Sequence, residues 1–466
     1  MAVRRILTSI TCAFIAVSAS AYASPRSDPT TGRAVFTGAT VPSPTSITLS
    51  PAAIGLDTLG TKLYVALTST LSQIAIDRRM LDLDSGALTA GPRIRDARIA
   101  PGGDLGVLWH PNASLTLGFA GRVPPPELQI DGRTSLGYHT LGGGQRTYTA
   151  TFAVSLRVTS AFYFGASVSH ENTFLRLRYL RDRALEEGER STEAPDAAER
   201  YDVAVRTPIL ATSNLKVNIG TVFRVAPDVW IGLAYHTPPG LDVQSTLDGD
   251  MTVVRAPRDG GTVVSGGSTV YVSLPASVDA EIRARLPEEL ELHVGGRWED
   301  LSRMQAYDVR GYGSVFGFNG IPEQMLRTRG LHDAFALWAG VEQVDLDERK
   351  PIRLGARLGF ETSSVDDDDL SPLTVAPAMV TLDVGAQARI GAWVVQLGYG
   401  IAYAPTTEVT DSAFDPRDRL TCIDSGFDYS TDACRATRTG YAIPTAAGDY
   451  RRIDHAMRLG FRYEFP

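Results

Sequence analysis

The sequence has few cysteines, almost no lysine and no long apolar run after its first two dozen residues. Without a run of about 18 apolar residues, the chain is not expected to be a bundle of membrane-spanning helices. The formal net charge of −8 argues against nucleic acid as a partner, because phosphate binding needs an excess of basic residues. What the chain has instead is abundant glycine and many stretches in which apolar and polar residues alternate.

Cysteine and histidine patterns predict neither a metal site nor a cofactor. Cys422 and Cys434 are the cysteines that remain after an expected N-terminal cleavage, and such a pair in an exported protein favours a disulfide. No histidine lies near either cysteine, and none has the His-Glu-x-x-His spacing. Ser167 lacks the closing glycine of a nucleophile elbow. A lipase using Ser167 and His170 is therefore a weak alternative, and we expect no enzyme activity.

The N-terminus has the features of a secretory signal peptide. Arg4 and Arg5 precede a mainly apolar stretch, residues 6–19, that is too short to span a bilayer. Ala21-Tyr22-Ala23 then fits small-x-small cleavage, so residues 1–23 are expected to be removed. A retained anchor is the alternative for this segment.

Alternation predicts a large antiparallel sheet. Around residue 282, for example, Ala280, Ile282 and Ala284 alternate with Glu281 and Arg283, so one face of the strand is apolar and the other charged. We expect fourteen such strands, at about 61–78, 104–110, 113–121, 147–158, 161–180, 213–225, 229–247, 277–286, 289–309, 332–346, 350–364, 377–390, 393–408 and 451–465.

The connections between these strands alternate in length. Six are tight, such as Thr159-Ser160 and Pro287-Glu288, and the seven between them are long. This rhythm is typical of an outer-membrane β-barrel, with turns in the periplasm and loops outside the cell. A charge facing lipid at mid-bilayer costs about 2–4 kcal/mol, so the charged faces are expected to point into the lumen.

Aromatic residues lie where girdles at the membrane interfaces are expected. Trp109, Trp230 and Trp393 each flank a tight turn, and ring side chains with a polar tip favour that interface. The alternative is that they are ordinary core aromatics. The chain ends in alternating apolar positions up to Phe465, as outer-membrane barrels recognised by the barrel assembly machinery commonly do, although Pro466 follows.

Two loop features allow a binding role. Tyr312, Phe316 and Phe318 are apolar residues in a glycine-rich loop at 310–331, where they predict a docking surface for hydrophobic ligands or, equally, packing against other loops. Four aspartates at 366–369 either bind cations shared with lipopolysaccharide or form a solvated loop tip.

Three short motifs follow one another near the N-terminus, namely Gly32-Arg33-Ala34, Gly38-Ala39 and Ser50-Pro51-Ala52. Two more lie further on, Val272-Ser273-Leu274-Pro275-Ala276 and Trp298-Glu299-Asp300-Leu301-Ser302. In these motifs the chain resembles the long-chain fatty-acid transporter (FadL/TodX-like) family of outer-membrane proteins, whose N-terminal hatch has the first three in this order, with Asn in place of Ser50.

The resemblance implies an all-β fold: a fourteen-stranded transmembrane antiparallel barrel at 61–466 with a hatch or plug, residues 24–60, inside its lumen. Hydrophobic ligands would dock among the outer loops, enter an internal apolar pocket and leave sideways beside a kinked third strand. That strand is 113–121 here, and Gly118 and Gly121 could permit the kink. Movement would be passive and would follow hatch rearrangement.

The sequence therefore predicts an outer-membrane channel for hydrophobic compounds, with long-chain fatty acids first and monoaromatic hydrocarbons second. Arg283, Arg297 and Arg357 are possible partners of a fatty-acid carboxylate, but they equally fit pairing with acids of the lumen. A general diffusion porin, an outer-membrane enzyme and an adhesin are the alternative classes. The expected partners are small hydrophobic molecules, membrane lipid, lipopolysaccharide and the assembly machinery, and the expected state is a monomer.

Overall fold

The structure is a computed structural model, and it describes residues 34–56, 60–82, 88–125, 127–130, 139–182, 202–241, 244–257, 260–316, 321–344, 351–410 and 442–465. Among these residues no helix has the length and apolar character needed to cross a membrane. The expected signal peptide, residues 1–23, lies outside the described residues.

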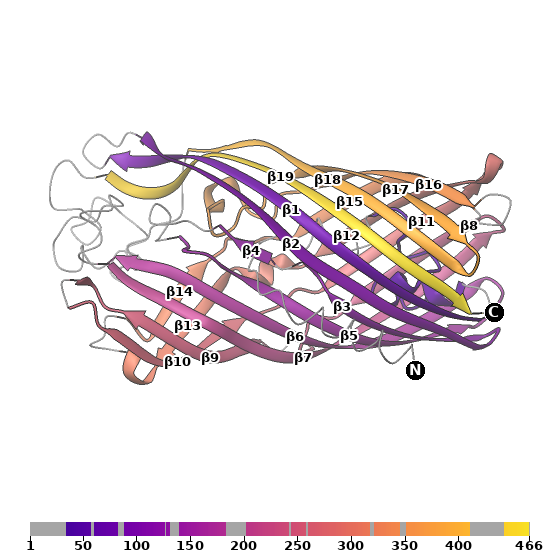
Figure 1. Cartoon of the computed structure of the whole chain (residues 1–466), viewed down its shortest axis with the longest axis horizontal. Helices are drawn as coiled ribbons and strands as arrows, with labels where there is room; N and C mark the ends of the chain where they lie inside the picture. Colours follow the sequence, from indigo (N-terminus) through magenta and orange to yellow (C-terminus); the bar gives the residue numbers. More distant parts are fainter. Residues whose placement is uncertain are drawn as a thin grey trace.

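Fourteen antiparallel strands close into a barrel, which confirms the predicted fold class (Figure 1). Each strand pairs with the next one of the ring, and the last pairs with the first from Thr61↔Phe465 onward. The ring consists of β1 (Gly60–Asp82), β2 (Leu88–Asn112), β3 (Leu115–Val123), β5 (Gly143–Arg157), β6 (Phe162–Asp182), β7 (Asp202–Ala226), β8 (Val229–His236), β11 (Ser277–Leu286), β12 (Leu290–Glu299), β15 (Ala334–Gln343), β16 (Ile352–Glu361), β17 (Met379–Ile390), β18 (Trp393–Val409) and β19 (Ala442–Phe465).

Alternation gives the barrel an apolar outside and a charged inside. In β16, Ile352, Leu354 and Leu358 are each more than half exposed, whereas Arg357 between them is 1% exposed. The same contrast holds in β11, where Ile282 faces outward and its neighbours are buried. Because successive side chains of a strand point to opposite faces, the buried charges face the barrel interior.

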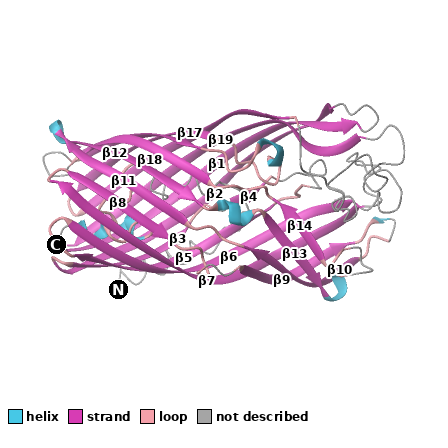
Figure 2. Cartoon of the chain, turned by 180° about the vertical axis from the view of Figure 1, so that it is seen from behind, coloured by secondary structure: helices cyan, strands magenta, loops and turns pink. Residues whose placement is uncertain are grey.

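Four further strands form a smaller sheet beside the ring, hereafter the side sheet (Figure 2). The first half of β7 pairs with β9, β9 with β10, β10 with β13 and β13 with β14. A fifth short strand, β4 (Glu127–Gln129), pairs with the start of β5. The side-sheet strands are β9 (Ser245–Val254), β10 (Val263–Val272), β13 (Ala306–Tyr312) and β14 (Gln324–Thr328).

Two predicted strands were too long. The strand expected at 229–247 is two strands, because β8 ends at His236 and β9 begins at Ser245. Pro238 and Pro239 lie between them, and proline has no N–H for the ladder. The strand expected at 289–309 likewise divides, because the chain leaves β12 after Glu299 and forms a 3-10 turn before β13 begins.

The helices of the described residues are single 3-10 turns. Two of them lie in the N-terminal segment, and η7 forms one of the tight turns that join ring strands at the end of the barrel where the chain ends (Figure 1). The side sheet lies toward the opposite end. The six turns are η2 (Pro44–Ile47), η3 (Ala53–Leu56), η7 (Pro287–Glu289), η8 (Leu301–Met304), η9 (Gly313–Val315) and η11 (Asp367–Asp369).

Candidate functional site

Residues 34–56, hereafter the lumenal segment, lie inside the ring of strands. The segment is compact: Ser46 and Ile47 are fully buried, and Ser46 donates its hydroxyl to the carbonyl of Val41 at 2.6 Å. The hydroxyl of Ser43 accepts a hydrogen bond from the N–H of Thr45 and so caps η2. Of the predicted hatch residues, Ala34, Gly38, Ser50, Pro51 and Ala52 lie here, and Gly32 and Arg33 lie outside the described residues.

Glycines on the inner face of the wall allow the lumenal segment to approach the strands closely. A Cβ atom added at Gly232 would lie 2.7 Å from the carbonyl oxygen of Ala39, and one at Gly118 would lie 2.9 Å from Cγ1 of Ile47. Seven ring strands contribute such a glycine, namely Gly106, Gly118, Gly165, Gly220, Gly232, Gly355 and Gly385. The segment is therefore surrounded by the wall.

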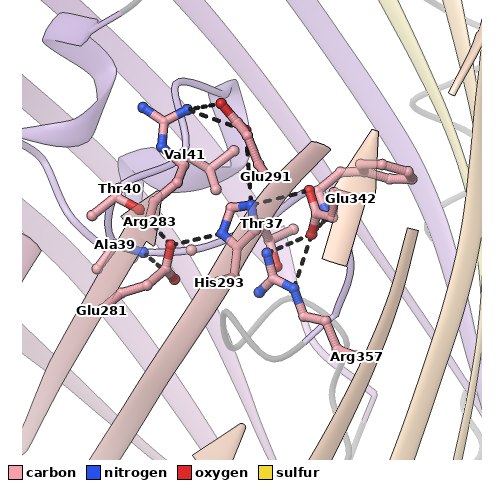
Figure 3. Close-up of polar contacts among 12 residues, drawn as sticks. Thr37, Ala39, Thr40, Val41, Glu281, Arg283, Glu291, His293, Glu342 and Arg357 are labelled. Atoms are coloured by element: carbon pink, nitrogen blue, oxygen red, sulfur yellow. Dashed lines mark hydrogen bonds and ion pairs between the residues drawn. The ribbon is translucent and has the colours of Figure 1, made fainter. Parts of the chain in front are cut away.

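Two glutamates of the wall bind the backbone of the lumenal segment (Figure 3). Glu342 of β15 accepts a hydrogen bond from the N–H of Phe36 at 2.8 Å. Glu281 of β11 accepts one from the N–H of Ala39 at 3.1 Å and one from the hydroxyl of Thr40 at 2.5 Å. Gly38 lies between these contacts with φ 153°, and a Cβ there would overlap the carboxylate of Glu281.

Basic residues of neighbouring strands hold both glutamates in place. His293 of β12 is fully buried, with Nδ1 3.2 Å from Oε1 of Glu281 and Nε2 3.6 Å from Oε2 of Glu342. Arg357 of β16 donates to Oε1 of Glu342 from two nitrogens, at 2.9 and 2.6 Å. Because buried charges are stable only when paired and hydrogen-bonded, this network fixes where the carboxylates meet the lumenal segment. We call Glu281, His293, Glu342 and Arg357 the anchor network.

A large apolar cluster fills the barrel interior toward the side sheet. Ile76 of β1, Leu177 of β6 and Val205 of β7 belong to it, and the inner face of the side sheet covers it with residues such as Met251 and Val309. All five side chains are at most 2% exposed. The apolar character of these packed side chains matches the chemistry of a site for small hydrophobic molecules, because such a site is mostly apolar with few polar groups.

Within the described part of the wall, the strand pairing is interrupted beside this cluster. β2 starts at Leu88, but it pairs with β3 only from Gly103 onward, because β3 ends at Val123. Three prolines follow, at 124–126, and they cannot donate to a ladder. Among the described residues, nothing pairs with the 88–102 part of β2 on that side, and we call this stretch the wall break.

The apolar cluster reaches both edges of the wall break. Ile94 lies in the wall break, where β2 pairs with β1 but has no described partner on its other side. Ile130 directly follows β4 on the opposite edge of the break, and both residues belong to the cluster. Arg146 of β5 donates a hydrogen bond to the carbonyl of Pro101 across the break at 3.0 Å. Predicted kink residues Gly118 and Gly121 lie in the paired part of β3, which is regular through both.

The three predicted carboxylate partners all pair with acids of the protein. Arg357 lies 2.6 Å from Glu342. The shortest pairs of the other two are Arg283 with Glu291 at 3.3 Å and Arg297 with Glu299 at 2.7 Å. This arrangement matches the alternative that the residue pattern left open, namely pairing with acids of the lumen.

The predicted loop sites are only partly described. Tyr312 and Phe316 are about half exposed at the tip of the side sheet, and Phe318 lies outside the described residues. Cys422 and Cys434, predicted to form a disulfide, also lie outside them. The aspartates at 366–369 include the 3-10 turn η11, and no group of three potential metal ligands occurs in the described part of the chain.

Sequence reasoning missed the anchor network. It expected a sideways exit beside the third strand, 113–121, only from the family resemblance and placed a glycine kink there instead of an interrupted ladder. Strand alternation places Glu281 and His293 on the inner face, but it does not predict that β15, far along the chain, brings Glu342 to the same point. The prolines at 124–126 were a usable signal for an interrupted strand, because proline within a strand ends its pairing.

Comparison with solved structures identifies the fold. A crystal structure of a Pseudomonas aeruginosa FadL homologue matches with a TM-score of 0.74 and 14% identity, covering 96% of this chain and 100% of that one. The Pseudomonas putida toluene transporter TodX matches with 0.62 and 12%, covering 96% and 98%. The Ralstonia pickettii toluene transporter TbuX matches with 0.57 and 15%, covering 96% and 99%.

These similarities confirm the predicted FadL/TodX-like fold. No family model matches the sequence, and no curated protein matches it either.

Proposed function

We propose that the protein is a passive outer-membrane channel for hydrophobic compounds and belongs with the FadL/TodX-like transporters. The observation that carries this proposal is that the apolar cluster ends at a wall break, while the lumenal segment occupies the straight path through the barrel. A water-filled pore has no favourable binding site for a hydrophobic molecule, whereas an apolar interior does.

In this proposal the ligand docks near Tyr312 and Phe316, enters the apolar cluster and leaves sideways through the wall break. The lumenal segment acts as a hatch whose rearrangement changes the shape of the apolar interior. No energy source is required, because the ligand gains free energy from apolar contacts on entry and from the membrane on exit.

Long-chain fatty acids are the first substrate class that we propose. They combine an apolar chain, which fits the cluster, with a carboxylate, which can bind an arginine in bidentate geometry. Monoaromatic hydrocarbons are the second, for a specific reason: Arg283, Arg297 and Arg357 already pair with protein carboxylates, and a hydrocarbon needs no cation. TodX and TbuX, with the same fold, are toluene transporters.

The test is uptake by Gram-negative cells that lack their own transporters of this type. Cells producing the protein are given labelled oleate or labelled toluene, and the lipids that co-purify with the protein are identified by mass spectrometry. We expect faster uptake of one of the two and a bound ligand of the same class. Uptake that rises equally for a small hydrophilic sugar would indicate a general diffusion porin and refute the proposal.

A further inference from the structure

Three arginines gather on the outer face of β6 and β7, above the apolar part of the wall. Along β6, Leu175 and Leu177 face inward, so Arg176 and Arg178 face outward. Arg206 of β7 is directly opposite Arg178 in the ladder. Like charges directly opposite each other in a sheet are destabilising, and an anion bound between Arg178 and Arg206 would relieve this repulsion.

The equivalent face on the other side of the barrel is neutralised by the protein itself. Asp77 of β1 pairs with Arg93 at 2.6 Å and also with Arg451. By contrast, no carboxylate among the described residues forms an ion pair with Arg178 or Arg206, and Nε of Arg178 is covered without a hydrogen-bond partner there.

Among the described residues, the surroundings supply no carboxylate to Arg178 or Arg206. Arg176 donates Nε to the carbonyl of Pro208 at 2.9 Å. Asp248 on the outer face of β9 accepts a hydrogen bond from Thr269 at 2.6 Å. Neither contact places a carboxylate on Arg178 or Arg206.

Apolar side chains continue directly below the arginines. Phe174 of β6 packs edge-on against Tyr148 of β5, with ring centroids 5.5 Å apart. Ile209 and Leu215 of β7 are both more than half exposed on the outside. A ligand that fits this surface has an anionic head and apolar chains that lie along the wall below it.

We propose that Arg176, Arg178 and Arg206 bind the phosphate of a phosphorylated glycolipid in the outer leaflet, with its acyl chains against Phe174 and Leu215. The inference rests on the proposed outer-membrane location and adds a lipid site outside the lumen. Guanidinium groups match phosphate oxygens in bidentate geometry. The apolar surface below them favours a lipid over free phosphate, because a lipid adds apolar contacts to Phe174 and Leu215 that the free ion cannot make.

The experiment measures lipid binding to the purified full chain by native mass spectrometry in detergent. The probes are lipid A with two phosphates and the same lipid after dephosphorylation. The variant is R178Q/R206Q, and R178K/R206K keeps the charge but not the planar fork. The matched control is R93Q/R451Q, which removes two arginines that the protein already neutralises.

The wild type is expected to bind the phosphorylated lipid about tenfold or more tightly than the dephosphorylated one. R178Q/R206Q should bind it about 25-fold more weakly, at about fivefold for each cation near an anionic surface. R178K/R206K should fall between them, and the control should match the wild type. The proposal is overturned if R178Q/R206Q binds like the wild type, if the control loses as much, or if excess inorganic phosphate displaces the lipid.

The same variants separate this inference from the proposed function. R178Q/R206Q, checked for folding by its heat-dependent migration in gels, should take up hydrophobic substrate at the wild-type rate. Normal uptake with lost lipid binding supports both ideas. Lipid binding without any uptake would refute the channel and leave the lipid site standing.

Discussion

Single carboxylates decide where the lumenal segment sits. Glu342 accepts a hydrogen bond from the main-chain N–H of Phe36, and Glu281 accepts one from the N–H of Ala39 and one from the hydroxyl of Thr40. The two carboxylates therefore bind mainly the path of the chain. His293 contacts both glutamates and is fully buried. A buried charge network of this kind fixes position and register more than it adds stability.

Removing both carboxylate charges should release the segment. In E281Q/E342Q the charge-assisted hydrogen bonds are lost, and His293 and Arg357 remain buried with weaker partners. Breaking a buried pair costs about 3–5 kcal/mol, so we expect frequent channel openings in planar bilayers and easier thermal unfolding.

The control for that experiment is D300N. Asp300 pairs with Arg303 at 2.6 Å, but Arg303 is about one third exposed, and such surface pairs contribute only about 0–1 kcal/mol. D300N should conduct like the wild type. If E281Q/E342Q also does so, the two glutamates do not hold the segment.

Gly118 and Gly121 of β3 allow a test of whether glycine is needed in this strand for close packing or for a bend. Gly118 faces inward, where an added Cβ meets Ile47 at 2.9 Å; Gly121 faces outward, where it meets Leu105 at 3.2 Å. G118A should therefore displace the lumenal segment at a cost of about 1–3 kcal/mol, and G121A should be nearly neutral. The free energy of unfolding in denaturant and the ion conductance are measured for both variants. Equal loss of uptake in the two would instead support the predicted kink.

The position of the wall break depends on the residue at which β3 ends. β3 pairs with β2 up to Val123 and with β5 up to Arg122, and the prolines that follow end the ladder. β4 then pairs with β5 alone. The break is thus encoded locally, in a few residues between two strands.

Replacing those prolines should close the break. P124V/P125T restores two N–H donors and strand-forming side chains, so β3 can extend along the free part of β2. We expect substrate uptake to fall several-fold while co-purified ligand remains bound, because entry stays open and exit does not. P238V, in the connection between β8 and β9, is the control. Unchanged uptake in P124V/P125T would show that ligands leave by another route.

Elements were predictable from the sequence to the extent that each strand carries its own pattern. The faces of 352–360 follow from alternation alone, because the pleat repeats every two residues. The side sheet was not predicted from the sequence, because β9 and β10 lie within one long connection between ring strands. Their apolar face packs on the apolar cluster rather than on lipid. Hydrogen-bond partners such as Glu281 and Ala39 are set by barrel closure, which no local pattern encodes.

Among the described residues, two parts of the chain occupy the barrel interior. The lumenal segment occupies the end with the tight turns, and the apolar cluster under the side sheet occupies the other part. Water and ions therefore meet a buried polar network and then an apolar core. A closed ring with this interior favours a sideways path for hydrophobic molecules over a straight path for polar ones.

Deleting residues 24–58 tests this arrangement directly. The ring begins at Gly60, so its fourteen strands keep all their pairings, while the inward charges of β11, β12 and β15 become hydrated. We expect ion conductance to rise sharply and hydrophobic uptake to lose its selectivity over small sugars. Deletion of Gly260 and Gly261, at the β9–β10 turn, should change neither. Conductance that stays at the wild-type level would mean that the lumenal segment is not the barrier to ions and that the apolar cluster closes the interior without it.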